Sequence, residues 1–132
     1  MTNMKAREYL ETSSETKDHI ALAQLLDRVK YEGRPLRWAH VPNEGKRSKK
    51  TAAILKQMGL KTGLSDILIF DTPPTYPICK GAAIELKKLS GGVTSDDQIY
   101  WLNYFNSNSW VAMVCEGLDQ AIEFLRECGY IR

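Results

Sequence analysis

The run Asp66-Ile-Leu-Ile-Phe-Asp71, followed by Ala82-Ala-Ile-Glu-Leu-Lys87, decides the fold of this chain. Both runs are rich in residues that favour extended backbone, and the proline-rich segment 72–77 interrupts the pattern between them. We therefore expect two neighbouring strands joined by a turn-forming loop. The first residue of the first strand, Asp66, and residues inside the second strand carry the chemistry that matters for function.

Period two along the second run places Glu85 and Lys87 on one face of the strand and Leu86 on the other. If the strands pair antiparallel around Tyr76, Asp66 lies opposite Leu86, and its side chain approaches Glu85 and Lys87. Oxygen-only carboxylate sites suit Mg²⁺ or Mn²⁺, and an adjacent lysine adds positive charge for a phosphate or an activated water. This combination is typical of a metal-dependent phosphodiester hydrolase. The alternative for each residue alone is a charged group on a solvated hairpin, but the convergence of all three favours a site.

Composition sets the broad class of the protein. A chain of 132 residues suits a single domain, 1–132, with 1–12 as a polar leader. Apolar content of 43% and charged content of 26% argue against a disordered chain. The net charge of +2 excludes a strongly basic binding protein but leaves room for a local basic face. No apolar run approaches the roughly 20 residues that span a bilayer, so no membrane partner is expected.

The cysteines and the N-terminus point to a reduced compartment. Cys79, Cys115 and Cys128 are odd in number and lack metal-type spacing, and Cys115 is expected to be a buried thiol. The first residues contain no signal-peptide core. We therefore expect a cytoplasmic protein.

The order of elements along the chain predicts a small α/β fold with a mixed sheet. Apolar residues at helical spacing follow a capping pattern at Thr12–Glu15, and Gly33 is expected to close that first helix. The later elements expected are a strand at 36–41, a helix at 48–58, strands at 66–71 and 82–87, a helix at 95–105, a strand at 110–115 and a helix at 118–128.

Two polar residues at helix starts have both a structural and a functional reading. Glu15 and Gln98 each occupy the third helical position of a capping box, where a side chain can bond a backbone N–H. A functional role for either residue is implied only by the family resemblance that follows. A basic loop supplies a further candidate, because it adjoins the predicted site and its cations can contact phosphates or simply face water: Lys46, Arg47, Lys49 and Lys50.

The pattern of Asp66, Glu85-Leu86-Lys87 and Gln98 resembles the PD-(D/E)XK nuclease superfamily. More narrowly, it resembles the VRR-NUC family, whose small stand-alone members are common in bacteriophages. Ser65 departs from the family, which often has proline before the aspartate. The proline contributes turn stiffness rather than chemistry. The resemblance covers nearly everything after residue 13, and its matching stretches are 40–44, 63–69, 83–87, 91–101, 111–115 and 119–122.

The resemblance implies a restriction-endonuclease-like mixed β-sheet flanked by helices, and a Mg²⁺- or Mn²⁺-dependent endonuclease acting on DNA. Asp66, Glu85 and the backbone carbonyl of Leu86 would be metal ligands. Lys87 would orient or help deprotonate the attacking water, and Gln98 would support that water or the lysine. Glu15 resembles an upstream acidic residue that often joins the site.

The family also implies a partner and a setting. The expected substrate is structured, branched or Holliday-junction-like DNA, cut by a homodimer, in the host cytoplasm if the chain is phage-encoded. The alternative is a non-catalytic nucleic-acid-binding or structural module on the same fold. The intact set of Asp66, Glu85 and Lys87 argues against that alternative, because a binding module has no need of all three.

Overall fold

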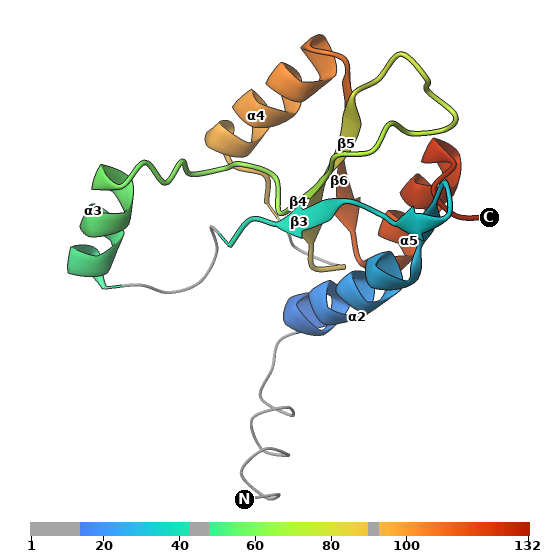
Figure 1. The fold of residues 1–132 in the computed structure, drawn as a ribbon. Helices are drawn as coiled ribbons and strands as arrows, with labels where there is room; N and C mark the ends of the chain where they lie inside the picture. Colours follow the sequence, from blue (N-terminus) through green and yellow to red (C-terminus); the bar gives the residue numbers. More distant parts are fainter. Residues whose placement is uncertain (1–13, 43–47, 90–92) are drawn as a thin grey trace, which may run out of the picture.

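The computed structural model describes residues 14–42, 48–89 and 93–132, whose arrangement is shown in Figure 1. The predicted leader and the cap at Thr12 lie outside these ranges. Within them, no helix is both long enough and apolar enough to cross a bilayer. The elements in chain order are α2 (Ser14–Arg28), β1 (Lys30–Tyr31), β2 (Arg34–Pro35), β3 (Trp38–His40), α3 (Lys49–Gln57), β4 (Ile67–Ile69), β5 (Gly81–Lys87), α4 (Asp96–Ser107), β6 (Trp110–Glu116) and α5 (Leu118–Cys128).

Four strands form one mixed sheet in the order β3-β4-β5-β6. The pairs β3–β4 and β4–β5 are antiparallel, and β5–β6 is parallel. Helices α2 and α5 pack together on one side of the sheet, and α4 lies on the other (Figure 1). The predicted architecture, a mixed sheet flanked by helices, is confirmed.

The register of β4 against β5 differs by one residue from the predicted register. Ile67 lies opposite Ile84, so one further step of the ladder places Asp66 opposite Glu85 rather than Leu86. The connecting loop is long and irregular, so apolar burial sets the register instead of a symmetric turn. Residues directly opposite each other share a face of the sheet, which brings the two carboxylates closer than the predicted pairing would.

The first helix ends earlier than predicted, at Arg28, and Gly33 lies in a hairpin between β1 and β2. The two turn residues, Glu32 and Gly33, have φ angles of 52° and 79°. A two-residue turn with positive φ at both positions matches the right-handed twist of short antiparallel strands. The positive φ expected at Gly33 is correct, but it serves a hairpin and not a helix end.

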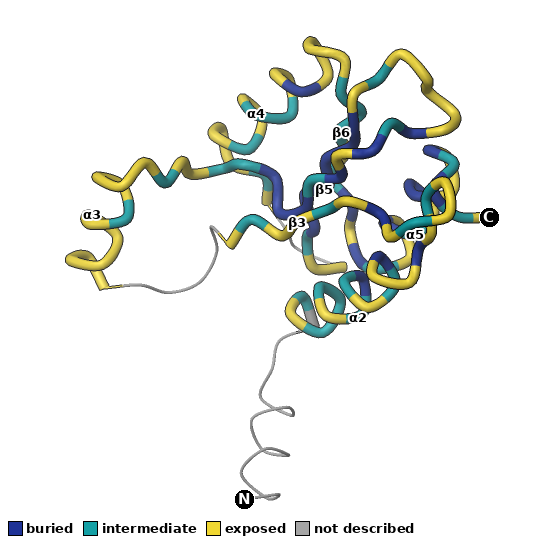
Figure 2. The backbone as a smooth tube through the Cα atoms, viewed as in Figure 1, coloured by how far each residue is buried: buried dark blue, intermediate teal, exposed yellow. Residues whose placement is uncertain are grey.

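The core lies between the sheet and the pair α2 and α5. Buried residues are concentrated in the central strands, whereas α3 has no buried residue (Figure 2). Burying one large aliphatic or aromatic side chain stabilises a fold by about 1.5–3 kcal/mol. Burial also raises the pKa of the Cys115 thiol to about 12, so the predicted buried thiol is confirmed. The main members of the core are Leu22, Leu26, Ile67, Ile69, Ile84, Leu86, Phe124 and Leu125.

Asp71 fastens the hairpin to the loop that follows β4. Its carboxylate accepts two hydrogen bonds from the Arg34 guanidinium, at 2.9 and 2.7 Å, and one from the backbone N–H of Arg37 at 2.8 Å. The Tyr130 hydroxyl donates to the Asp71 carbonyl at 2.6 Å. The Arg34 hydrogen bonds are the main reason that the pKa of Asp71 is lowered from 3.8.

We expect Asp71→Asn to lower stability at neutral pH and to flatten the acid side of the stability profile. Because the folded-state pKa is depressed, the contribution of Asp71 is fully present above about pH 4 and is lost as pH falls through the folded pKa. Urea unfolding from about pH 7 to about pH 2 measures it. The control is Glu123→Gln, which removes an exposed ion pair with Arg126 and should leave the profile unchanged. A profile for Asp71→Asn parallel to that of the wild type would contradict the assignment.

Candidate active site

Asp66 and Glu85 interlock at the point where β4 begins beside β5. The Leu86 N–H donates to Asp66 Oδ2 at 2.8 Å, and the Asp66 N–H donates to Glu85 Oε2 at 3.2 Å. The Asp66 carbonyl accepts from the Val41 N–H at 2.7 Å, which continues the pairing of β3 with β4. Each carboxylate is therefore oriented by the backbone of the neighbouring segment.

Both carboxylates are buried: Asp66 is 0% exposed and Glu85 is 1% exposed. Burying a charged group is costly unless it is paired and hydrogen-bonded. Lys87 supplies a positive charge, since its Nζ lies 3.6 Å from Glu85 Oε1 and its side chain is 12% exposed. Asp66, Glu85 and Lys87 therefore lie close together, as predicted.

Gln98 has the predicted capping role and also contacts a carboxylate of the candidate site. Its Oε1 accepts from the Ser95 N–H at 2.9 Å, and its own N–H donates to Ser95 Oγ at 3.2 Å, which is a complete capping box at the start of α4. Its Nε2 donates to Glu85 Oε1. A carboxamide carries a donor and an acceptor, so one side chain caps the helix and also orients a carboxylate of the site.

The loop before Asp66 is fastened to the same helix. Thr62 Oγ1 donates to Asp97 Oδ2 at 2.7 Å, and Trp101 Nε1 donates to the Thr62 carbonyl at 3.2 Å. Gly63 has φ of 83°, and a Cβ there would lie 2.5 Å from the Asp97 carbonyl carbon. This close approach requires glycine, and it holds the segment leading to Asp66 against the helix that carries Gln98.

His19 lies beside Asp66, and His40 lies next to His19, a pairing that was not predicted. His19 Nε2 is 3.8 Å from Asp66 Oδ2, and the rings of His19 and His40 have centroids 5.0 Å apart. His40 lies opposite Ile67 on β3, which places it next to the segment that carries Asp66. Sequence spacing alone could not have found this pair, because His19 comes from a helix packed against the sheet.

The donor set fits a hard divalent cation. In a strand, the N–H and C=O of one residue point to the same side, so the Leu86 carbonyl faces the side on which its N–H meets Asp66. Two carboxylates and a carbonyl are the oxygen ligands that Mg²⁺ and Mn²⁺ prefer. Among the described residues no three His, Cys, Asp or Glu side chains form a metal-holding group. The contribution of Glu15, half-buried in the first turn of α2, stays a prediction.

The predicted basic loop is only partly described. Lys46 and Arg47 lie outside the described residues, while Lys49 and Lys50 are exposed in the first turn of α3. Ser48 caps this helix as expected, because its side chain accepts from the Thr51 N–H at 3.1 Å. Figure 1 shows α3, which begins at Lys49, standing away from the sheet. The role of these lysines in phosphate contact stays a prediction.

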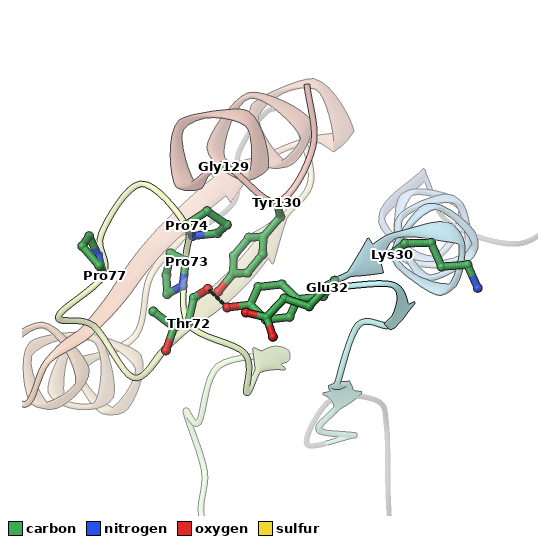
Figure 3. A pocket seen from close by; sticks show the side chains of 9 residues that line it. Lys30, Glu32, Thr72, Pro73, Pro74, Pro77, Gly129 and Tyr130 are labelled. Carbon is green, nitrogen blue, oxygen red and sulfur yellow. Dashed lines mark hydrogen bonds between the residues drawn. The ribbon is translucent and has the colours of Figure 1, made fainter.

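A separate cavity of about 370 Å³ contains none of the predicted site residues (Figure 3). Its lining comes from the β1–β2 hairpin, the proline-rich loop and the segment that follows α5. The hydroxyl of Tyr31 donates to the Thr72 carbonyl at 2.8 Å, and that of Tyr130 donates to the Asp71 carbonyl. These tyrosines therefore hold the loop in place, and the paired carboxylates are the stronger candidate for catalysis.

No family model and no curated protein matches the sequence. Among solved structures, the fold matches a chain described as "VRR_NUC domain protein". The match has a TM-score of 0.73 and 25% sequence identity, and it covers 92% of this chain and 90% of that chain. With its four-stranded mixed sheet and flanking helices, this chain has the fold of the VRR-NUC family, a restriction-endonuclease-like fold of the nuclease type.

Proposed function

We propose that this chain is a Mg²⁺- or Mn²⁺-dependent DNA nuclease that hydrolyses phosphodiester bonds. The observation that carries the proposal is the buried, interlocked pair Asp66 and Glu85 with Lys87 beside it. Asp66, Glu85 and the Leu86 carbonyl would hold the cation, which would lower the pKa of a bound water and offset charge on the phosphate. The nuclease-type fold supports the same reaction class.

Lys87 is the residue proposed to act on the attacking water. Its ammonium group is close enough to Glu85 to share a water with that carboxylate, and it can orient the water or stabilise the hydroxide that forms. Gln98 is a positioning residue, because it acts on Glu85 rather than on the substrate. Lys49 and Lys50, with Lys46 and Arg47, are proposed to contact the DNA backbone.

The finer parts of the proposal rest on the family resemblance. These are an endonuclease activity with preference for branched DNA, a homodimer that presents two sites to two strands, and a cytoplasmic location. The experiment is incubation of the purified protein with a four-way junction and with linear duplex, in Mn²⁺ or in EDTA. Cleavage in Mn²⁺ alone supports a nuclease, whereas binding without cleavage supports the binding-module alternative.

We expect Asp66→Asn or Glu85→Gln to reduce the cleavage rate by about 1,000-fold or more, because a bound cation contributes several kcal/mol to stabilising the transition state. The fold and much of the DNA affinity should persist, since the replacements keep size and hydrogen-bonding capacity. Cleavage in Mn²⁺ and circular dichroism measure the two effects. Asp119→Asn, an exposed carboxylate in the first turn of α5, is the control. Undiminished cleavage by either site variant would contradict the proposed site.

The two contacts of Gln98 can be separated by substitution. Gln98→Glu should keep the cap, because glutamate suits the third position of a capping box, but it should slow cleavage by about 10- to 100-fold by placing a second carboxylate against Glu85. Ser95→Ala should do the reverse, costing about 1 kcal/mol of stability while leaving cleavage normal. Urea unfolding measures the stability of each variant, and the cleavage rate measures the effect of each variant on the site. If Gln98→Glu cleaves DNA at the same rate as the wild type, Gln98 acts only as a helix cap.

Replacing Lys49 and Lys50 by alanine should weaken DNA binding and flatten its salt dependence. Each phosphate contact adds roughly 0.9 to the slope of log affinity against log salt on duplex DNA, so two lost contacts remove up to about 1.8. Cleavage at saturating DNA should change less than affinity. The control replaces two exposed lysines elsewhere, Lys30 and Lys80. Identical slopes for the α3 variant and the wild type would mean that these lysines are ordinary solvated surface.

A further inference from the structure

A pocket of about 230 Å³ lies between α2 and the edge of the sheet formed by β3 and β4. Its walls are mostly apolar, and two imidazole rings are among its lining groups. Half of the Ile20 side chain is exposed, at 48%, although it lies beside a buried strand residue. The lining groups that matter here are Ile20, Ala23, Trp38, Ile67, His19 and His40.

This pocket borders the candidate active site. His19 lines the pocket, and its Nε2 lies 3.8 Å from Asp66 Oδ2. Ile67 lines it as well and directly follows Asp66 in the chain. A group seated in the pocket would therefore be separated from the Asp66 carboxylate by the His19 side chain alone.

The lining suits a flat, mainly apolar ring. Trp38 Nε1 donates to Asp27 Oδ1 at 3.0 Å, which holds the indole in one orientation. The rings of His19 and His40 lie 5.0 Å apart at an interplanar angle of 42° and add two more planar surfaces. The volume is below the roughly 300 Å³ at which pockets for drug-sized ligands begin, so it suits a single ring system.

We propose that this pocket receives one nucleobase of the DNA substrate, from the nucleotide that flanks the scissile phosphate. The inference rests on the proposed nuclease function and adds to it a feature of the substrate. A base stacks on aromatic side chains through its π-face, and such stacking tolerates any base. With few polar groups in its walls, the pocket holds a base without reading its identity.

A base can reach the pocket only after it has left the duplex stack. Unpairing and unstacking cost a few kcal/mol in a perfect duplex and least where the nucleotide is already unpaired. The pocket therefore favours DNA with an unpaired nucleotide beside the cleavage point. This gives a physical basis for a preference for structured DNA that is independent of the family resemblance.

The test uses three DNA duplexes: one fully paired, one with a single unpaired adenosine, and one with an abasic residue at that same unpaired position. Their affinities for the protein are measured by fluorescence anisotropy in EDTA, so that catalysis plays no part. The wild-type protein should bind the unpaired adenosine about 5- to 150-fold more tightly than the abasic residue, which is the range expected for stacking of one base. Cleavage of the same DNA in Mn²⁺ is measured separately and tests the proposed function by itself.

Two variants link the effect to the pocket. Ala23→Phe fills the cavity and should bring the ratio of the two affinities to about 1, while Ile20→Ala removes one wall and should reduce it. The matched control is Ile54→Ala on α3, which replaces an equally exposed isoleucine, 46% against 48%, and should keep the wild-type ratio. Circular dichroism checks folding, and Ile20→Ala decides alone if Ala23→Phe does not fold.

A wild-type ratio near 1, or no measurable binding of the unpaired adenosine, would overturn the inference. The inference would also be overturned if a folded Ala23→Phe variant kept the wild-type ratio of the two affinities. If Ala23→Phe does not fold, an unchanged ratio in Ile20→Ala would overturn it. Neither result depends on cleavage in Mn²⁺. The pocket inference and the proposed nuclease function can therefore fail separately.

Discussion

The rest of the structure depends on the two carboxylates that interlock where β4 begins beside β5. Asp66 accepts from the backbone of Leu86, and Glu85 accepts from the backbone of Asp66, so neither strand can shift without breaking buried hydrogen bonds. Because side chains alternate along a strand, a slip of one residue would turn Glu85 into the apolar core and Leu86 out of it. An unpartnered carboxylate in that core would cost several kcal/mol. The register that folds the sheet is therefore also the register that assembles the site.

Helix ends could be predicted from the sequence where their physics is local. Ser95 and Gln98 bond each other's backbone groups within one turn, and Gly129 ends α5 with φ of 88°, so a few residues suffice to determine each end. Gly33 marks the limit of such signals. Its positive φ suits a helix end and a hairpin turn equally. The hairpin is anchored from far along the chain, where the Tyr31 hydroxyl meets the Thr72 carbonyl.

The site itself could be predicted only as far as neighbouring strands determine it. Asp66, Glu85 and Lys87 converge because they lie on two strands whose apolar patterns require them to pair, even though the predicted register was wrong by one residue. Contributions from helices were harder to predict, because the position of a helix on a sheet depends on packing across the whole core. His19 could not be placed beside Asp66 from the sequence. The position of α3 away from the sheet was hard to predict for the same reason. That helix has no buried residue, so no core contact holds it against the sheet.

Two aspartates bracket β4, and their partners separate a structural role from a chemical one. Asp71 is gripped by the planar fork of Arg34 at 2.9 and 2.7 Å, a geometry that satisfies and neutralises a single carboxylate. Asp66 shares its surroundings with a second carboxylate. The basic groups described near that pair are looser: Lys87 Nζ is 3.6 Å from Glu85, and His19 Nε2 is 3.8 Å from Asp66. Two carboxylates side by side, with Lys87 near one of them, suit the divalent cation proposed for this site. Both residues are aspartates at the ends of one short strand, and the second carboxylate beside Asp66 is the reason that we propose Asp66, and not Asp71, as the place for chemistry.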